Sequence, residues 1–169
     1  MTLLFPTQQV PYFQDSTKIS RNLNYPLWHL EDVLLPLFGK SYTNDSLRET
    51  ILSANHTWCV HKNGKCVGCA LMTDVGSNRG LYMMLFGIKK SEQGRGLGKR
   101  LLENIIRWSR THGYRFIYLH TEHNNQKAIQ MYKKAGFIQQ AFQPNSFEQL
   151  PQLGSGVVPL LVLITSIFI

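Results

Sequence analysis

Three glycines at the junction of an apolar segment and an amphipathic segment constrain this chain more than any other feature. Residues 81–88 form an apolar run too short for a helix, which is typical of a strand buried on both faces. From Leu97 onward, apolar side chains recur at helical spacing, which predicts an amphipathic helix. Gly94, Gly96 and Gly98 would let the backbone approach a ligand there, with several N–H groups and the positive end of the helix dipole facing one point. The junction therefore predicts a phosphate-binding loop, and a purely structural turn is the alternative.

Two well-known phosphate motifs do not fit this loop. A P-loop would need glycine at Gln93 and a hydroxyl side chain at Arg100. The dinucleotide-binding pattern fails at Lys99, where its last glycine should stand. The pattern that does fit is Gln-x-x-Gly-x-Gly, carried by Gln93, Gly96 and Gly98.

This pattern resembles the coenzyme A pyrophosphate motif of the GNAT superfamily of N-acetyltransferases. A second segment matches that family at the expected intervals, through Asn125, Ala128, Tyr132, Gly136 and Phe137. Because the two motifs occur in the right order, separated by one predicted helix and one predicted strand, the pair is far more specific than either motif alone. The resemblance covers about residues 58–140.

The resemblance implies a fold of the α/β (α+β) class. We expect a mixed, mostly antiparallel sheet of six to seven strands with about four flanking helices, in which strands 81–88 and 114–121 run parallel and splay apart at the centre. Residues 1–169 would form a single domain. Residues 1–56 would supply acceptor-side helices, residues 57–140 the acetyl-CoA-binding core, and residues 141–169 a loop and a closing C-terminal strand.

Two helices are predicted before the core. Residues 27–38 have an amphipathic helical pattern despite Pro36. Residues 46–52 predict a second helix, in which Ser46 and Glu49 have the spacing of a capping box.

The two ends of the sequence carry weaker signals. Residues 1–12 contain two prolines and no basic start, so we expect a short strand or extended arm and no signal peptide. Residues 157–169 are largely apolar but too few for an ordinary spanning helix. Their β-branched content favours a closing strand paired with residues 137–142, and a membrane-seeking or partner-binding tail is the alternative.

A hairpin follows the helices, and it contains all three cysteines. Asn63 followed by Gly64 is the strongest short hairpin signal in the chain. Cys66 and Cys69 are an odd number of residues apart, which should send their side chains to opposite faces of a strand, so a shared metal or a disulfide is not expected. With Cys59 the number of cysteines is odd, which favours reduced thiols and a cytoplasmic location.

The positive charge is concentrated in the half assigned to the cofactor. Residues 81–140 hold 11 Lys and Arg against 3 Asp and Glu, and this excess of +8 equals that of the whole chain. Coenzyme A is polyanionic, so its binder should have such a face, although a solvated basic surface or a nucleic-acid surface would have one too. We expect no nucleic-acid partner because no recognised nucleic-acid motif accompanies the charge.

Acetyl transfer from a thioester to an amine needs a neutral amine and a proton for the departing thiolate. The resemblance places Tyr132 near the coenzyme sulfur as general acid, and packing of its ring under the sheet is the alternative. Some family members have a glutamate that acts as general base on the strand before the loop. Tyr82 holds that position here, so the carboxylate is absent. Glu122, His120 and His123 are the alternatives for the base, each with a surface or structural role as its competing reading.

The site residues implied by the resemblance fall into two sets. The candidate catalytic residues are Tyr132, Glu122 and Tyr82. The candidate cofactor-binding residues lie on the central strand, in the loop and on the last helix: Phe86, Gly87, Ile88, Gln93, Gly94, Arg95, Gly96, Leu97, Gly98, Lys99, Asn125 and Tyr132.

The sequence thus predicts an acetyl-CoA-dependent N-acetyltransferase that acts by direct attack in a ternary complex. Acetyl-CoA would be the co-substrate, and no metal is expected. The acceptor would be a primary amine on a small molecule or a protein, and a homodimer stays compatible with the sequence. The alternative is a non-catalytic acyl-CoA sensor or interaction module on the same fold.

Overall fold

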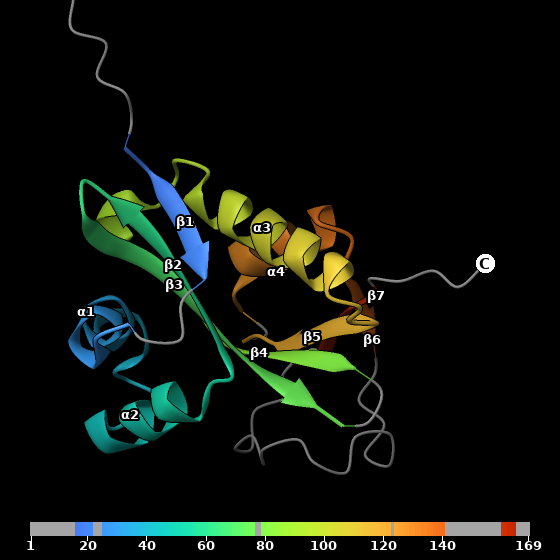
Figure 1. The fold of residues 1–169 in the computed structure, drawn as a ribbon, viewed down its shortest axis with the longest axis horizontal. Helices are drawn as coiled ribbons and strands as arrows, with labels where there is room; N and C mark the ends of the chain where they lie inside the picture. Colours follow the sequence, from blue (N-terminus) through green and yellow to red (C-terminus); the bar gives the residue numbers. More distant parts are fainter. Residues whose placement is uncertain (1–15, 22–24, 77–78, 123, 141–159, 165–169) are drawn as a thin grey trace, which may run out of the picture.

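Two helical layers enclose one twisted sheet in the computed structural model, which describes residues 16–21, 25–76, 79–122, 124–140 and 160–164 (Figure 1). Within these ranges the strands are β1 (Lys18–Arg21), β2 (His56–Lys62), β3 (Lys65–Val75), β4 (Gly80–Ile88), β5 (Phe116–His120), β6 (Ile138–Gln140) and β7 (Leu160–Ile164). The helices are α1 (Leu27–Phe38), α2 (Asn44–Ser53), α3 (Leu97–Thr111) and α4 (Gln126–Lys134), with a 3₁₀ turn η1 (Lys90–Glu92).

The described strands form one sheet in the order β1-β2-β3-β4-β5-β7-β6. Neighbouring strands are antiparallel except β4 and β5, which run parallel. The predicted fold class is therefore confirmed. The predicted pairing of the C-terminal strand is confirmed for β7, which pairs with β6 and also with β5 and so lies between them.

The sheet has a separate hydrophobic core on each face. One core joins the sheet to α3 and α4 and includes Trp58, Leu101 and Ile105, which are fully buried. The other joins the sheet to α1 and α2 and includes Leu34 and Leu47. Strand β4 contributes to both cores, which explains why its sequence is apolar without alternation.

Glycine ends helix α3 as the sequence predicts, but the next strand begins two residues later than predicted. Gly113 has a φ of 74°, and the Tyr114 N–H donates to the Ser109 carbonyl at 3.0 Å. The Arg115 N–H donates to the Arg79 carbonyl at 2.9 Å. These two residues complete the helix end and a turn, so β5 begins at Phe116 and not at residue 114.

The predicted capping box of α2 is wrong. The helix begins at Asn44, and its N-cap is Thr43, whose side-chain oxygen accepts from the Ser46 N–H at 3.1 Å. Ser46 is therefore already in the first turn, and its hydroxyl donates back to the Thr43 carbonyl at 3.0 Å. Thr43 takes the capping role because its hydroxyl reaches the free N–H of Ser46 in the first turn of the helix.

The predicted orientation of the cysteines is also wrong. Asn63 and Gly64 form the hairpin turn with φ values of 51° and 77°, as the sequence predicts. The register then shifts, however, because Val67 has no partner opposite it on β2. This β-bulge turns Cys66 to the same face as Cys69, and both lie with Cys59 in the core under α1 and α2. All three thiols are free in the structure.

A second bulge separates the two central strands. Strand β4 pairs with β5 only from Gly80 to Met83. Its register with β3 shifts at the next residue, Met84, which has no partner opposite it. Beyond this point β4 continues to Ile88 beside β3 alone, so its other edge opens toward β5. The expected splayed parallel pair is therefore present.

Some terminal predictions lie outside the described residues. These are the arm at residues 1–12 and the parts of the closing strands at residues 141–142, 157–159 and 165–169. The first described strand, β1, was not predicted and pairs with β2 from Lys18 to Arg21. None of the helices described by the structure is long and apolar enough to cross a membrane.

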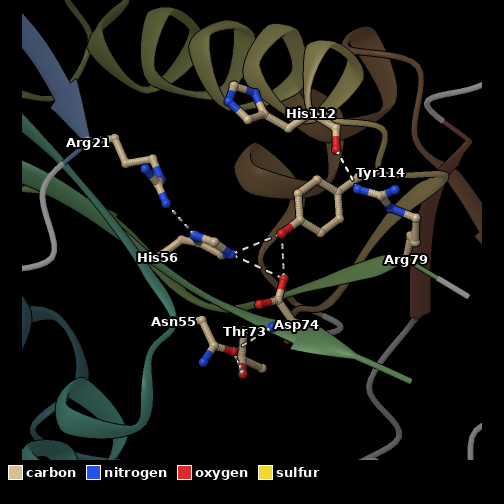
Figure 2. A network of polar contacts seen from close by, with 8 residues as sticks. All are labelled: Arg21, Asn55, His56, Thr73, Asp74, Arg79, His112 and Tyr114. Carbon is tan, nitrogen blue, oxygen red and sulfur yellow. Dashed lines mark hydrogen bonds and ion pairs between the residues drawn. The ribbon is translucent and has the colours of Figure 1, made fainter. Parts of the chain in front are cut away.

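A polar network ties the C-terminal end of α3 to the sheet (Figure 2). The Tyr114 hydroxyl donates to Asp74 Oδ1 at 2.6 Å, and His56 Nε2 lies 3.1 Å from the same oxygen. The other ring nitrogen of His56 lies 2.9 Å from the Arg21 guanidinium, which stacks over Trp108 of α3 at 4.5 Å from the ring centre. The network therefore joins β1, β2, β3 and α3.

The donors in this network assign the tautomer of His56. Arg21 can only donate, so His56 Nδ1 must accept and Nε2 must carry the hydrogen that faces Asp74. Burial opposes ionisation of Asp74, but the hydrogen bonds from Tyr114 and His56 outweigh it and lower the pKa of the carboxyl. An ionised Asp74 thus stabilises the fold.

We predict that Asp74→Asn lowers the free energy of unfolding at neutral pH and that this loss shrinks in acid. Because the folded-state pKa of Asp74 is lowered from 3.8, its contribution is complete above that value and disappears as the pH falls through the folded-state pKa. Urea unfolding of both proteins between neutral and acidic pH measures the difference. Glu49→Gln, on an exposed position of α2, is the control. A difference for Asp74→Asn that stays constant with pH would contradict the assignment.

Candidate functional site

The loop between β4 and α3 has a backbone that only glycine adopts readily. Gly94 and Gly96 have φ values of 77° and 76°, in the left-handed region. The Gln93 side chain donates to the Ile88 carbonyl at 2.9 Å, which fastens the loop to the end of β4. The glutamine and two of the glycines in the predicted motif thus shape the loop.

The start of α3 presents main-chain donors to this loop. The first main-chain hydrogen bond runs from the Arg100 N–H to the Gly96 carbonyl at 3.1 Å. The N–H groups of Leu97, Gly98 and Lys99 precede it, and no side chain among the described residues caps them. Together with the helix dipole they suit a phosphate group.

The third glycine serves packing. A Cβ atom on Gly98 would lie 3.3 Å from Met131 Sδ and 3.7 Å from a side-chain carbon of Phe86. Glycine here lets α3 approach β4 and α4 closely.

Two exposed cations flank the loop. Arg95 Nη1 lies 3.4 Å from Glu92 Oε2, and Lys99 Nζ lies 3.8 Å from Glu103 Oε1. Both cationic groups are exposed, and Glu92 keeps a second partner in Lys62, so Arg95 and Lys99 can turn to an anionic ligand at little cost.

Tyr132 lies at the opening between β4 and β5. Its hydroxyl donates to Met83 Sδ at 3.9 Å. Met83 is the last residue of β4 that pairs with β5. Its ring lies 6.0 Å from Phe86, in the part of β4 beyond the bulge. Burial raises the pKa of Tyr132 well above its ordinary range, so its phenol keeps the proton.

A second group of polar side chains lies on the other face of the sheet. The Tyr82 ring stacks on Tyr118 with centroids 4.9 Å apart, and its hydroxyl lies 3.4 Å from His120 Nδ1. Burial raises the pKa of Tyr82 to about 12 and lowers the pKa of His120. Tyr82 and Met83 are adjacent on β4 and point to opposite faces, so the pair Tyr82–His120 lies across the sheet from Tyr132.

The remaining candidates lie at the start of α4 or near it. Glu122 is exposed, and no contact among the described residues joins its carboxylate to Tyr82, His120 or Tyr132. Asn125 caps α4, because its side-chain oxygen accepts from the Ala128 N–H at 3.3 Å, which leaves its amide NH₂ for other partners. His123 lies outside the described residues.

Residues 25–137 match the acetyltransferase (GNAT) family. The chain belongs to the GNAT family. The match spans α1 to the end of α4 and so includes the glycine-rich loop, the splayed strands and Tyr132.

Similar proteins agree with the GNAT assignment. The chain is 31% identical over 105 residues to a probable N-acetyltransferase, san, of Drosophila melanogaster, covering 60% of this chain and 56% of the relative. It thus spans little more than half the length of that relative.

Solved acetyltransferase structures share the fold at low identity. The ribosomal-protein-S18-alanine N-acetyltransferase of Escherichia coli superposes with a TM-score of 0.71 at 18% identity, covering 90% of this chain and 96% of the other. A GNAT acetyltransferase of Elizabethkingia anophelis with acetyl-CoA bound superposes with a TM-score of 0.68 at 18% identity, covering 89% of this chain and 99% of the other.

The pairing of Tyr82 with His120 is what sequence reasoning missed at this GNAT site. Both residues were candidates, but their contact depends on the register of β4 against β5. A sequence signal exists in the alternation of Phe116, Tyr118 and His120, which places three rings on one face of β5. That alternation could have identified the cluster.

We predict that Gly96→Ala weakens coenzyme A binding beyond its effect on stability. A side chain at this φ costs about 1–2 kcal/mol, and relaxation of the turn would move the donors at the start of α3. Calorimetry with coenzyme A and thermal unfolding measure the two effects. Gly64→Ala is the matched control, since Gly64 also has a φ of +77° with nothing near its Cβ position but lies in the hairpin turn. Equal losses of stability with unchanged affinity in both variants would contradict a ligand role for the loop.

Proposed function

We propose that this protein is an acetyl-CoA-dependent N-acetyltransferase that transfers an acetyl group to a primary amine by direct attack in a ternary complex. The observation that carries the proposal is the position of Tyr132, with its hydroxyl beside Met83 where β4 and β5 part, on the face that also carries the phosphate-type donors. Acetyl-CoA supplies a thioester. Every other requirement falls on the chain itself.

The chain would hold the co-substrate at two places. The N–H groups of Leu97, Gly98 and Lys99 would bind the diphosphate, with added charge from Arg95 and Lys99. The open edge of β4 from Phe86 to Ile88 would pair with the amides of the pantetheine arm, since it lacks a β5 partner there. The amide NH₂ of Asn125, which has no hydrogen-bond partner among the described residues, would bind the same molecule at the start of α4.

Tyr132 would act as general acid. Burial keeps its phenol protonated at neutral pH, so a proton is available when the thiolate departs. The contact with Met83 Sδ is weak and would yield to a stronger acceptor.

His120, oriented by Tyr82, would accept the proton of the incoming amine. Burial lowers the pKa of His120, which leaves its imidazole neutral at physiological pH and able to accept. The Tyr82 hydroxyl, 3.4 Å away, orients the ring. Glu122 is the alternative base, and no described contact brings it to the cluster.

The two groups support direct transfer because they lie on opposite faces of the sheet. A thiol carrier that enters from the face of α3 and α4 would meet an amine from the face of α1 and α2 at the opening between β4 and β5 (Figure 1). No covalent enzyme intermediate is then needed.

We infer that the acceptor is an α-amine rather than a lysine side chain. The surroundings of Tyr82 and His120 are aromatic and apolar. Tyr118 stacks on Tyr82, and Val75, Met84 and Phe116 pack against these two tyrosines. An α-amino group, with a pKa near 8 against about 10.4 for lysine, is neutral roughly 200 times more often at pH 7 and so needs only a weak base. The similar E. coli structure is that of the ribosomal-protein-S18-alanine N-acetyltransferase.

We also infer that residues 1–169 work as one domain in a reducing, cytoplasmic compartment. The helices of residues 1–56 pack on the same sheet as the core, and the three buried thiols are free.

We predict that Tyr132→Phe lowers kcat by about 10²-fold or more with little change in affinity for acetyl-CoA. Thiol release is followed with acetyl-CoA and two peptides, one with a free N-terminus and no lysine, the other with a blocked N-terminus and one lysine. We expect turnover of the first. Tyr114→Phe, at the far end of α3, is the control and should affect stability more than kcat. Acetyl-CoA binding without thiol release on any amine would favour the non-catalytic sensor.

We predict that kcat/KM rises with pH along a limb below about 6.5, the ordinary value for histidine. Burial of His120 lowers its pKa, so the base becomes neutral, and therefore active, at a lower pH than a free imidazole. The pH profile of His120→Gln should lack this limb. A limb that persists in His120→Gln but disappears in Glu122→Gln would assign the base to Glu122.

A further inference from the structure

A groove of about 1030 Å³ runs between α3 and α4. Its floor is apolar and consists of Leu102, Ile106, Met131 and Ala135. These side chains also cover the core beneath the helices. The groove therefore has the form of a docking surface with a hydrophobic base.

Cations line both walls of this groove. Lys99, Arg107 and Arg110 come from α3, and Lys127 and Lys134 come from α4. All five are exposed, and Glu103 is the one carboxylate among the described lining residues. Of these five cations only Lys99 forms an ion pair among the described residues, and its partner is Glu103. The other four cations are available to an external anion.

We propose that this groove, the α3–α4 groove, binds an acidic amphipathic helix of a partner protein. The α3 cations Lys99, Arg107 and Arg110 follow one another at spacings of eight and three residues, so they lie on one side of that helix. Lys127 and Lys134 form the facing line on α4. A helix with an apolar stripe flanked by Glu or Asp on both sides satisfies the floor and both walls at once.

The floor distinguishes this partner from a nucleic acid. A single strand is held by a basic groove with aromatic side chains that stack on its bases, and no aromatic side chain is among the described lining residues. An apolar floor of aliphatic side chains and methionine instead suits the buried face of a helix.

The length of the groove distinguishes it from the coenzyme A site. Arg110 lies about three helical turns, roughly 16 Å, along α3 from Lys99 at the phosphate loop. Only the end of the groove at Lys99 adjoins that loop. The inference therefore does not depend on the proposed transferase activity.

The test uses the full chain saturated with coenzyme A and a fluorescent synthetic helix of about 14 residues, with a leucine stripe flanked by glutamates. Fluorescence anisotropy gives its affinity. Arg107→Glu/Lys134→Glu should weaken binding by about tenfold or more. Lys18→Glu/Lys65→Glu, the same change of net charge at the hairpin end of the sheet, should leave the affinity unchanged. Neither pair touches the residues assigned to catalysis or to coenzyme A.

A scrambled peptide of the same composition, which cannot form the stripe, should bind about tenfold more weakly. Equal binding of the two peptides, or equal losses in the two double variants, would overturn the proposal in favour of unspecific charge attraction. Tighter binding of a single-stranded RNA of similar length, lost in Arg107→Glu/Lys134→Glu, would overturn it in favour of a nucleic-acid surface. Binding of the peptide to the protein free of coenzyme A that disappears once the protein is saturated with coenzyme A would overturn it by making the groove a part of the cofactor site.

Discussion

The loss of pairing between β4 and β5 after Met83 is the constraint on which the rest of the structure depends. A continuous ladder there would close the sheet and leave no main-chain edge for a ligand. The bulge at Met84 breaks that ladder while β4 keeps its pairing with β3 as far as Ile88. Cores on both faces hold the parted strands in place, so the opening is a fixed feature of the fold.

Helix α3 transmits this geometry to the loop before it. Its C-terminal end is anchored by the cation–π contact of Arg21 with Trp108. The hydrogen bonds of Asp74, His56 and Tyr114 add to this anchor (Figure 2). Its first turn packs through Gly98 against α4. With both ends fixed, the N–H groups at its start keep one direction, which is what an anion site built from a helix dipole requires.

The positive charge of the chain serves more than one surface. Part of it flanks the phosphate-type loop, and part continues along α3 and α4, where most cations have no described ion-pair partner. Tyr82 and His120 lie on the opposite face, among aromatic side chains. The fold thus separates the face proposed for anion binding from the face proposed for the amine, and the splayed strands connect the two.

The sequence by itself determined what depends on neighbouring residues. The glycines at 94 and 96, the hairpin at Asn63 and the end of α3 at Gly113 follow from backbone preferences that need no distant partner. The buried central strand and the helix after it follow from apolar periodicity, and family resemblance supplied the rest of the fold class.

Only the tertiary structure decided the features that depend on register. The bulge at Val67 reversed the expected facing of Cys66, and Thr43 replaced Ser46 as the cap of α2 because the helix begins at Asn44, two residues before Ser46. The contact of Tyr82 with His120 arises because β5 lies beside β4 in one particular alignment. A one-residue shift inverts the facing of every side chain on a strand, and such shifts are set by packing between segments far apart in the chain.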